Sequence, residues 1–377
     1  MTSPSVTSPP SAHDGEPGRF AFVLHPLRIA DFARKYPLVR YLPDRFVEAA
    51  FRHIRPRLVS HITGIQSPTG VRAEGWFIGL PLTPRLLLES PLEFVYPRLI
   101  ECGRIAEEQG ARIVGLGAFT KIVGDRGVTV ANNLRIAVTT GNSYTAATAV
   151  EGALLAAQRV GSEPANVTAA VIGATGSIGA VASQMLARSV GRLLLVARTP
   201  EALEALQARL RTGSRADIAV GTDVKNAVRE ADVVLTVSSA VDVLIEPGDL
   251  RPGAVVCDVA RPRNVSRMVY ERRNDVLVID GGVIEVPGDV DFGFNFGFPP
   301  RMCEACVAET ILLALEHRYE NFTLGKDISL SQVEEISALA RKHGFRLSGF
   351  RRFERAISDA EVDRIRQAAQ LGRLARV

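Results

Sequence analysis

Cysteine is scarce in this sequence of 377 residues, which contains four cysteines. So few cysteines in so long a chain do not form the disulfide framework of a small secreted domain. The single Cys-x-x-Cys pair, Cys303 and Cys306, has no second pair of ligands at a suitable spacing, so the sequence does not predict a zinc site.

Excess charge and long apolar runs are also missing. The formal net charge is +4, and no basic run is interleaved with aromatic residues, so nucleic acid is not a predicted partner. No apolar run approaches the roughly 18–20 residues of a membrane span, and the N-terminus lacks the apolar segment of a signal peptide. The sequence therefore predicts a cytoplasmic protein whose residues 1–18, rich in serine and proline, form a disordered leader.

The composition that remains is that of a globular protein, with 46% hydrophobic and 23% charged residues. The length suggests two domains. We predict a substrate domain of α/β or α+β type over 19–164. Its expected elements are a helical segment over 40–60 broken at Pro56, strands within 62–80, a helical stretch over 84–109, a strand within 111–119 and a helix over 139–160.

Strands alternate with helices over residues 165–285, which predicts a Rossmann-like, doubly wound parallel sheet and an α/β fold class. The expected strands are 167–172, 193–197, 218–220, 233–237, 255–257 and 276–279. Beyond this domain, residues 286–347 are expected to form a cysteine-bearing helix that begins at Pro299 and returns to the first domain. Residues 348–377 are an Arg-rich tail, which we expect to be an amphipathic helix at the solvated surface.

A glycine-rich turn separates the first of these strands from the helix expected over 180–189. Its glycines let the backbone approach a pyrophosphate, and the helix N-terminus then supplies free N–H groups. The alternative is a tight turn that binds nothing. The flanking strand and helix favour a dinucleotide site that consists of Gly173, Ala174, Thr175, Gly176, Ser177, Ile178 and Gly179.

The end of the second strand indicates which dinucleotide binds. NAD sites usually place an Asp or Glu there to hold the ribose 2′-hydroxyl, whereas this strand ends in Val-Ala-Arg198-Thr199. A guanidinium suits a 2′-phosphate by charge and by bidentate geometry, and Thr199 adds a hydroxyl. We therefore predict NADPH as the cofactor, with Arg198 and Thr199 in its site.

Cys303 and Cys306 lie near the start of the helix expected from Pro299, on neighbouring positions of one face. A helix N-terminus stabilises a thiolate and lowers the pKa of the thiol, which suits a nucleophile. A buried cysteine that packs as a small apolar residue is the commoner case, and a redox dithiol is a further alternative. The residues alone leave these alternatives open.

Six blocks of sequence occur in an order and spacing typical of one family. They are Gly115-Leu-Gly-Ala-Phe-Thr120, Thr139-Thr-Gly-Asn-Ser-Tyr-Thr-Ala146, Val171-Ile-Gly-Ala-Thr-Gly-Ser-Ile-Gly179, Asp280-Gly-Gly-Val-Ile-Glu285, Ala305-Cys-Val-Ala-Glu309 and His343-Gly-Phe345. In these blocks the chain resembles the long-chain acyl-[acyl-carrier-protein] reductases of cyanobacterial type. The second and fifth blocks together are quite specific, whereas many families share the glycine turn.

The resemblance implies a reaction. In that family the Cys of Ala-Cys-x-Ala-Glu takes the acyl group of a fatty acyl thioester, and NADPH then reduces it to an aldehyde. Cys306 is the implied nucleophile, and acyl-carrier protein or acyl-CoA is the implied donor. The oxyanion donors are expected among the backbone N–H groups near Cys306 and the residues Ser143, Tyr144 and Thr145.

The chain departs from the family in its N-terminal segment, in its Arg-rich tail and at Lys121, where cyanobacterial members have a small polar residue. The tail and the net charge would suit an acidic carrier protein or peripheral contact with an acidic membrane. An alternative function is a dehydrogenase of the shikimate and amino-acid type, with Lys121 in proton transfer; another is an NADPH-binding sensor without turnover. We expect Asp258 to be a turn residue and Glu309 to pair at the surface.

Overall fold

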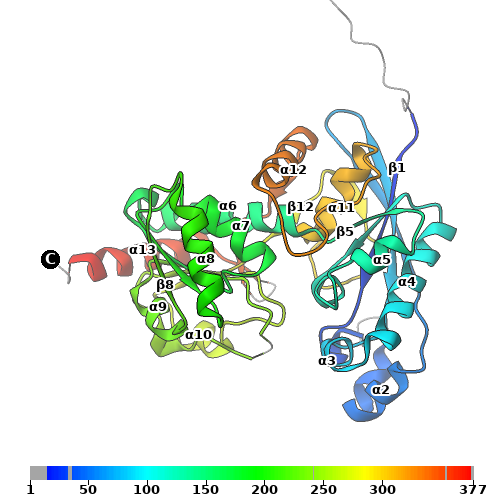
Figure 1. Cartoon of the computed structure of the whole chain (residues 1–377), viewed down its shortest axis with the longest axis horizontal. Coiled ribbons are helices and arrows are strands. Elements are labelled where there is room, and N and C mark those ends of the chain that lie inside the picture. The colour runs from blue at the N-terminus through cyan, green and yellow to red at the C-terminus, as the bar shows by residue number, and fades with distance from the viewer. Residues whose placement is uncertain (1–14, 33–35, 241, 353–354, 375–377) are drawn as a thin grey trace, which may run out of the picture.

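The computed structural model describes residues 15–32, 36–240, 242–352 and 355–374. The predicted leader falls largely outside them, since residues 1–14 are not among the described residues. Two six-stranded sheets lie side by side, one at the right of Figure 1 and one at the left, with helices on their faces. No helix within the described ranges combines the length and apolar character that crossing a membrane requires.

The first sheet has the strand order β13-β2-β3-β1-β4-β5. Its strands are β1 (Gly18–Leu24), β2 (Arg57–Gln66), β3 (Arg72–Gly79), β4 (Ile113–Leu116), β5 (Ala137–Thr139) and β13 (Gly288–Asp291). Strands β3, β1, β4 and β5 are parallel, while β2 and β13 add an antiparallel edge. Alternate residues of β1 enter two cores: Phe20 and Phe22 face α11 (Ala305–Leu315), and Ala21 and Val23 face α4 (Leu92–Glu108).

Two expectations for this region are wrong in detail. The helix before Pro56 is α2 (Asp44–Phe51), and the chain after Pro56 joins β2 instead of continuing as a helix, because its backbone pairs with β3. Thr139 ends β5 and does not begin a helix. The remaining short helices are α1 (Ile29–Phe32), η1 (Pro37–Tyr41), α3 (Pro84–Glu89), η2 (Ala118–Lys121) and α5 (Val128–Asn132).

The second sheet is parallel throughout, with the order β11-β10-β9-β6-β7-β8. Its strands are β6 (Thr168–Ile172), β7 (Arg192–Val196), β8 (Asp217–Gly221), β9 (Val233–Thr236), β10 (Val255–Asp258) and β11 (Leu277–Asp280). The short helix η3 (Pro164–Asn166) precedes β6, and the helices between the strands are α7 (Ser177–Leu186), α8 (Pro200–Arg211), α9 (Val224–Glu230), η4 (Pro247–Asp249) and α10 (Arg267–Arg272). This is the doubly wound arrangement, so the predicted α/β fold class is confirmed.

One long helix connects the two sheets. The first half of α6 (Asn142–Arg159) packs Tyr144, Ala146 and Ala147 into the core that contains α11. Its second half packs Ala153 and Ala156 into the core beneath the second sheet. Helix α12 (Leu330–His343) lies against α6 and α11 between the two sheets (Figure 1).

The cysteine-bearing helix begins at Ala305 and not at Pro299, so this prediction is wrong. Residues Met302–Glu304 form strand β14, which pairs with β12 (Val283–Glu285); β12 also pairs with β15 (Arg346–Leu347). The backbone before Ala305 is therefore engaged in sheet pairing. The Ala305 N–H then donates to Gly282 O (2.8 Å), which fixes the start of α11.

The tail contains β16 (Arg351–Arg352), β17 (Arg355–Ala356) and α13 (Asp359–Leu374). The expected amphipathic helix is present as α13, but its placement at the solvated surface is wrong, because Val362 and Ile365 are buried against the second sheet. Several of its arginines pair within the molecule: Arg352 and Arg355 both donate to Glu361, at 2.6 Å. Arg376 of the predicted tail lies outside the described residues.

Candidate active site

The glycine-rich turn lies between β6 and α7, at the carboxyl end of the second sheet. Gly173 has a φ of 90°, and its N–H donates to Val196 O at the end of β7 (2.8 Å). A Cβ on Gly179 would lie 2.2 Å from the Gly173 carbonyl oxygen, so only glycine fits there. Helix α7 has no side-chain cap at Gly176, which leaves its first N–H groups for an anion. The turn thus fits a pyrophosphate.

Arg198 and Thr199 follow β7 directly, beside this turn. The Arg198 side chain is exposed, and Thr199 is the N-cap residue of α8 but makes no side-chain capping bond. Both side chains are therefore placed at the end of the second strand, where the ribose of a dinucleotide lies in this fold.

A pocket opens where the glycine-rich turn faces the first sheet. The second sheet contributes residues after β9 and β10 together with Ile178 of α7, and the other wall contains Lys121, Thr145 and Cys306. The lining residues are Ala118, Lys121, Ile122, Thr145, Ile178, Val237, Ser238, Ser239, Val259, Ala260, Arg261, Gly281, Gly282, Glu304, Ala305 and Cys306. Ligands of doubly wound sheets bind at such a crevice outside the carboxyl ends of the strands.

Cys306 is the second residue of α11 and is 4% exposed. Gly141, with a φ of 70°, packs directly against it: a Cβ on Gly141 would lie 2.2 Å from Cys306 Cβ. A Cβ on Gly117 would lie 3.8 Å from Cys306 Sγ. The glycines of two separate sequence blocks therefore surround the thiol and leave space beside its sulfur.

The expectation of a lowered thiol pKa is wrong for Cys306. Burial raises the pKa of this thiol to about 12, and the nearby Glu304 carboxylate raises it further. Lys121 and the Val307 backbone N–H lower it, but they do not offset the burial. Cys303 does not share a helical face with Cys306, since it lies on β14, fully buried, and burial raises the pKa of its thiol as well.

The three side chains considered as oxyanion donors have different surroundings. The Ser143 hydroxyl donates to Glu309 Oε2 (2.6 Å), and the Thr145 hydroxyl donates to Gly141 O (2.6 Å). Tyr144 is buried in the core, and burial raises the pKa of its phenol. Of these three residues, Thr145 lines the pocket beside Cys306.

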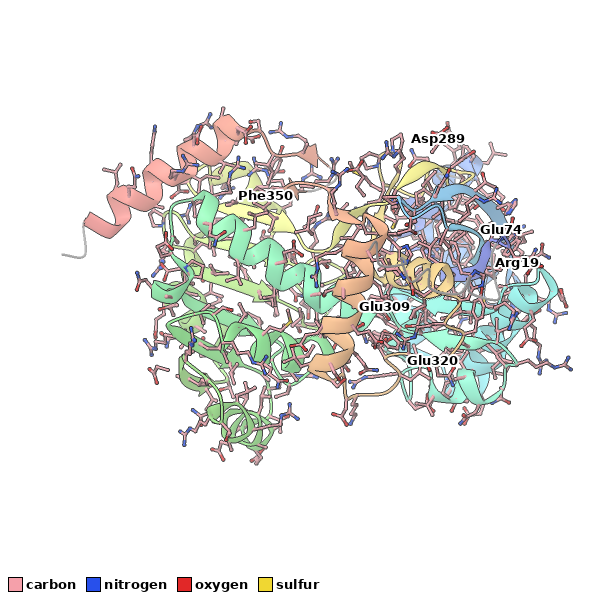
Figure 2. The ribbon with its side chains drawn as sticks, turned by 90° about the horizontal axis from the view of Figure 1, so that it is seen from above. Arg19, Glu74, Asp289, Glu309, Glu320 and Phe350 are labelled. Carbon is pink, nitrogen blue, oxygen red and sulfur yellow. The ribbon has the colours of Figure 1, made fainter. Side chains whose placement is uncertain are left out.

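Glu309 is fully buried, so the expectation of a surface pair is wrong (Figure 2). Its Oε2 accepts from Ser143 Oγ and from the Tyr144 N–H (2.9 Å). Its Oε1 accepts from Thr139 Oγ1 (2.6 Å) and Thr323 Oγ1 (2.9 Å). One carboxylate one helical turn after Cys306 thus joins α11, the end of β5, the start of α6 and the loop at Thr323.

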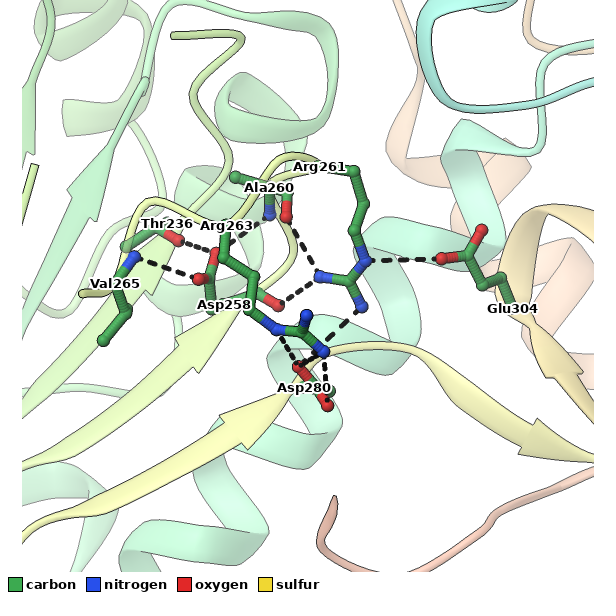
Figure 3. Close-up of polar contacts among 8 residues, drawn as sticks. All are labelled: Thr236, Asp258, Ala260, Arg261, Arg263, Val265, Asp280 and Glu304. Carbon is green, nitrogen blue, oxygen red and sulfur yellow. Dashed lines mark hydrogen bonds and ion pairs between the residues drawn. The ribbon is translucent and has the colours of Figure 1, made fainter. Parts of the chain in front are cut away.

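Asp258 is also more than a turn residue, since it ends β10 and is buried. Its carboxylate accepts from Thr236 Oγ1 (2.6 Å) and from the backbone N–H groups of Ala260 and Val265 (3.1 Å each), as Figure 3 shows. These bonds fold the loop after β10, which carries Arg261. Sequence reasoning missed Arg261, although its place directly after a buried strand was a usable signal.

His25 lies beside the loop that follows β4. The Phe119 N–H donates to His25 Nε2 (3.1 Å), which leaves the proton on Nδ1, where it faces Pro26 O (3.3 Å). Burial lowers the pKa of this imidazole to about 4. The ring is therefore neutral in the folded protein at neutral pH.

We expect this neutral ring to make stability depend on pH. Because the folded-state pKa lies below the unfolded value of 6.5, the contribution of His25 is complete above pH 6.5 and is lost as the pH falls toward 4. The loss is between about 1 and 3 kcal/mol, since the ring keeps some solvent exposure. Urea unfolding of wild type and His25→Gln at pH 7.5 and 5.0 measures it. An equal loss in both proteins would contradict the assignment.

Residues 155–281 match the sequence family described as shikimate / quinate 5-dehydrogenase. Together with the doubly wound sheet and its glycine-rich turn, this match defines the class: an α/β oxidoreductase that uses a nicotinamide cofactor. The chain is 30% identical over 305 residues to the long-chain acyl-[acyl-carrier-protein] reductase of Synechococcus elongatus. The alignment covers 77% of this chain and 87% of that protein. The chain belongs to the family of this reductase.

Two further proteins are similar to the chain. It is 34% identical over 285 residues to the aminotransferase PigE of a Serratia species, which covers 74% of this chain. The aligned part spans 33% of that longer protein. A crystal structure of L-tryptophan dehydrogenase from Nostoc punctiforme superimposes with a TM-score of 0.42 and 12% identity, covering 93% of this chain and 88% of the other.

Proposed function

We propose that this oxidoreductase reduces a long-chain fatty acyl thioester to an aldehyde with NADPH, through an acyl group carried on Cys306. The observation that carries the proposal is the shared pocket, because the Cys306 thiol and Ile178 beside the glycine-rich turn line the same space. An acyl group on Cys306 would therefore face a bound nicotinamide. The family relative whose name includes this activity adds support.

The proposed reaction has two stages, acylation of Cys306 and reduction of the acyl group that it then carries. Cys306 attacks the thioester carbonyl and displaces the carrier thiol, which leaves the acyl group on its sulfur. NADPH, when bound at the glycine-rich turn, would supply the hydride that this acyl carbon accepts. The resulting hemithioacetal on Cys306 then collapses to the aldehyde and free enzyme. Because the Ser143 and Thr145 hydroxyls already donate to other acceptors, we assign oxyanion stabilisation to backbone N–H groups in the first turn of α11 after Ala305, whose own N–H donates to Gly282 O.

An apolar cavity near the thiol supports a long acyl chain. It is lined mainly by apolar and aromatic side chains, among them Leu24, Phe32, Val59, Leu80 and Phe296. Leu24 and Phe296 also line a second cavity, which continues to Gly117, Val307 and Glu304 beside Cys306. The second cavity is also lined by charged side chains, among them Arg261 and Asp280, so it connects the surroundings of the thiol with the apolar first cavity, where the chain would lie.

The test is mass spectrometry of the purified protein after mixing with palmitoyl-acyl-carrier protein in the absence of NADPH. The proposal expects one acyl adduct on the peptide that contains Cys306, and its release as aldehyde when NADPH is added. The same experiment with palmitoyl-CoA measures which carrier is preferred. If wild-type protein forms no adduct with either donor while it still binds NADPH, the proposed reaction is wrong.

Cofactor preference is expected to depend on Arg198. Arg198→Ala removes the guanidinium proposed to hold the 2′-phosphate, and the loss of a charge-assisted pair corresponds to about 10–100-fold weaker NADPH binding. NADH binding should stay unchanged. Fluorescence titration measures both, and Arg209→Ala, an exposed arginine on α8, is the matched control. Equal losses for NADPH and NADH would contradict the 2′-phosphate assignment.

The small-acid dehydrogenase is the second candidate, since the shikimate / quinate dehydrogenase match favours it. That match extends over residues 155–281, which contain the second sheet but not Lys121. It therefore supports the nicotinamide cofactor more than a small acid as substrate. Turnover of a small hydroxy or amino acid by Cys306→Ala protein would favour this candidate.

A further inference from the structure

Glu304 has an unusual position for a residue that begins a helix. It is the N-cap residue of α11, yet its side chain makes no capping bond. Instead the Cys306 thiol donates to Glu304 Oε2 over 3.8 Å, and the Arg261 Nε lies 3.4 Å from Glu304 Oε1 (Figure 3). The carboxylate thus lies between the proposed nucleophile and Arg261, which is in the loop after β10 of the second sheet.

The buried thiol needs a proton acceptor before it attacks. Cys306 is 4% exposed, whereas the Glu304 side chain is 30% exposed, so the carboxylate connects the sulfur with solvent. The other charged groups that act on Cys306 are Lys121, Glu309 and Arg261. Lys121 and Arg261 are cations, and the oxygens of Glu309 already accept from hydroxyl and N–H groups. Among these groups, Glu304 is the carboxylate that contacts the sulfur.

We propose that Glu304 is the general base and acid of Cys306, with Arg261 as the residue that orients it. This inference rests on the proposed function. The Cys306 S–H bond breaks and its proton moves to Glu304 Oε2, while the sulfur bonds to the acyl carbon. The bond from that carbon to the carrier sulfur then breaks, and the departing thiolate takes the proton from Glu304 to leave as a thiol.

Glu304 then acts a second time. After hydride transfer, the bond between the acyl carbon and Cys306 breaks, which releases the aldehyde and leaves a thiolate on Cys306. This thiolate takes one proton from solvent through Glu304, so each turnover consumes one hydride and one proton. A group that accepts and returns the same proton is effective when it lies within reach of the sulfur and of water.

Arg261 is a positioning residue because it reaches Glu304 from the opposite wall of the pocket. Its Nη1 donates to Ala260 O (3.0 Å) and Asp258 O (3.3 Å), and its Nη2 lies 3.9 Å from Asp280 Oδ1. These contacts hold the guanidinium from the ends of β10 and β11. Arg261 engages Oε1 of Glu304 (Figure 3), and Oε2 is the oxygen that accepts from the Cys306 thiol.

Glu304→Gln separates this role from a purely electrostatic one, because the two predict opposite changes. The variant loses the proton acceptor, so acyl-enzyme formation without NADPH should slow by about 10²–10⁴-fold. It also removes a negative charge beside the thiol, so alkylation of Cys306 by iodoacetamide at pH 8 should not slow. Quenched-flow mass spectrometry measures the first rate and timed alkylation the second, in the full-length protein.

Three further measurements make the result decisive. Glu304→Asp, which keeps a carboxylate, should recover part of the acylation rate, and Arg261→Met should slow acylation about tenfold with the KM for the acyl donor unchanged. Glu334 is an exposed carboxylate on α12, so Glu334→Gln is the control for replacing a glutamate by glutamine away from the site. If wild type and Glu304→Gln acylate equally fast, or Glu304→Gln is faster, the base role is wrong although the acyl-enzyme stands. If wild type forms no acyl-enzyme, the proposed function fails first.

Discussion

Cys306→Ala is expected to abolish aldehyde formation from an acyl thioester, with kcat at least about 10⁴-fold below wild type. The reason is that no acyl-enzyme forms without the sulfur, and the hydride acceptor is then never placed in the pocket. NADPH affinity should remain, because the glycine-rich turn lies on the other wall. Aldehyde production measured by gas chromatography, with NADPH titration in parallel, tests both expectations.

Cys303→Ala is the matched control for this substitution. Both cysteines are buried, and burial raises the pKa of both thiols. Cys303 lies on β14 within the core that contains α11, and it is not among the residues that line the pocket. We expect Cys303→Ala to retain most of the activity. Equal losses in the two variants would mean that Cys306 acts through packing and not as a nucleophile.

Glu309→Gln is expected to lower the free energy of unfolding by about 2–4 kcal/mol. The carboxylate accepts four hydrogen bonds, from Thr139, Ser143, the Tyr144 N–H and Thr323. A glutamine keeps one acceptor oxygen and turns an NH₂ group toward two of these donors. Reductase activity should also fall, because the same bonds align the first turns of α6 and α11.

Urea denaturation followed by circular dichroism measures this change. Glu320→Gln serves as the control, since Glu320 is paired with Arg318 at the surface and its loss should change stability by less than about 0.5 kcal/mol (Figure 2). If Glu309→Gln and wild type had the same urea midpoint of unfolding, this would contradict the account of Glu309 as the acceptor that joins four segments.

The second sheet was predictable because its strands are short apolar runs that alternate with helical segments. The glycine-rich turn was predictable for a related reason: its spacing has meaning once a strand precedes it and a helix follows. These signals are local along the chain, and hydrophobic patterning reports them directly. The start of α11 was misplaced because residues before Ala305 pair with β12, a contact between distant segments that no local pattern reports.

Polar contacts across the site were harder to predict. Arg261 follows β10 of the second sheet, whereas Glu304 ends β14, so nothing in the sequence near either one indicates the other. Glu309 did leave a signal that was overlooked. Helix α11 is apolar on every side, and a helix of that kind is buried all round, so its single glutamate had to be buried and bonded.

The continuity of helix α6 limits how the two sheets can move relative to one another. Its 18 residues run without interruption from the turn against Cys306 to the core of the nucleotide sheet, and both halves are packed. The helix is therefore a rigid connection whose two ends are both packed into a core. If the two sheets moved apart by bending this helix, buried alanines of α6 would become exposed at one of its ends. We expect the spacing between thiol and nucleotide turn to be set when the protein folds, so that substrate and cofactor enter a gap of fixed width.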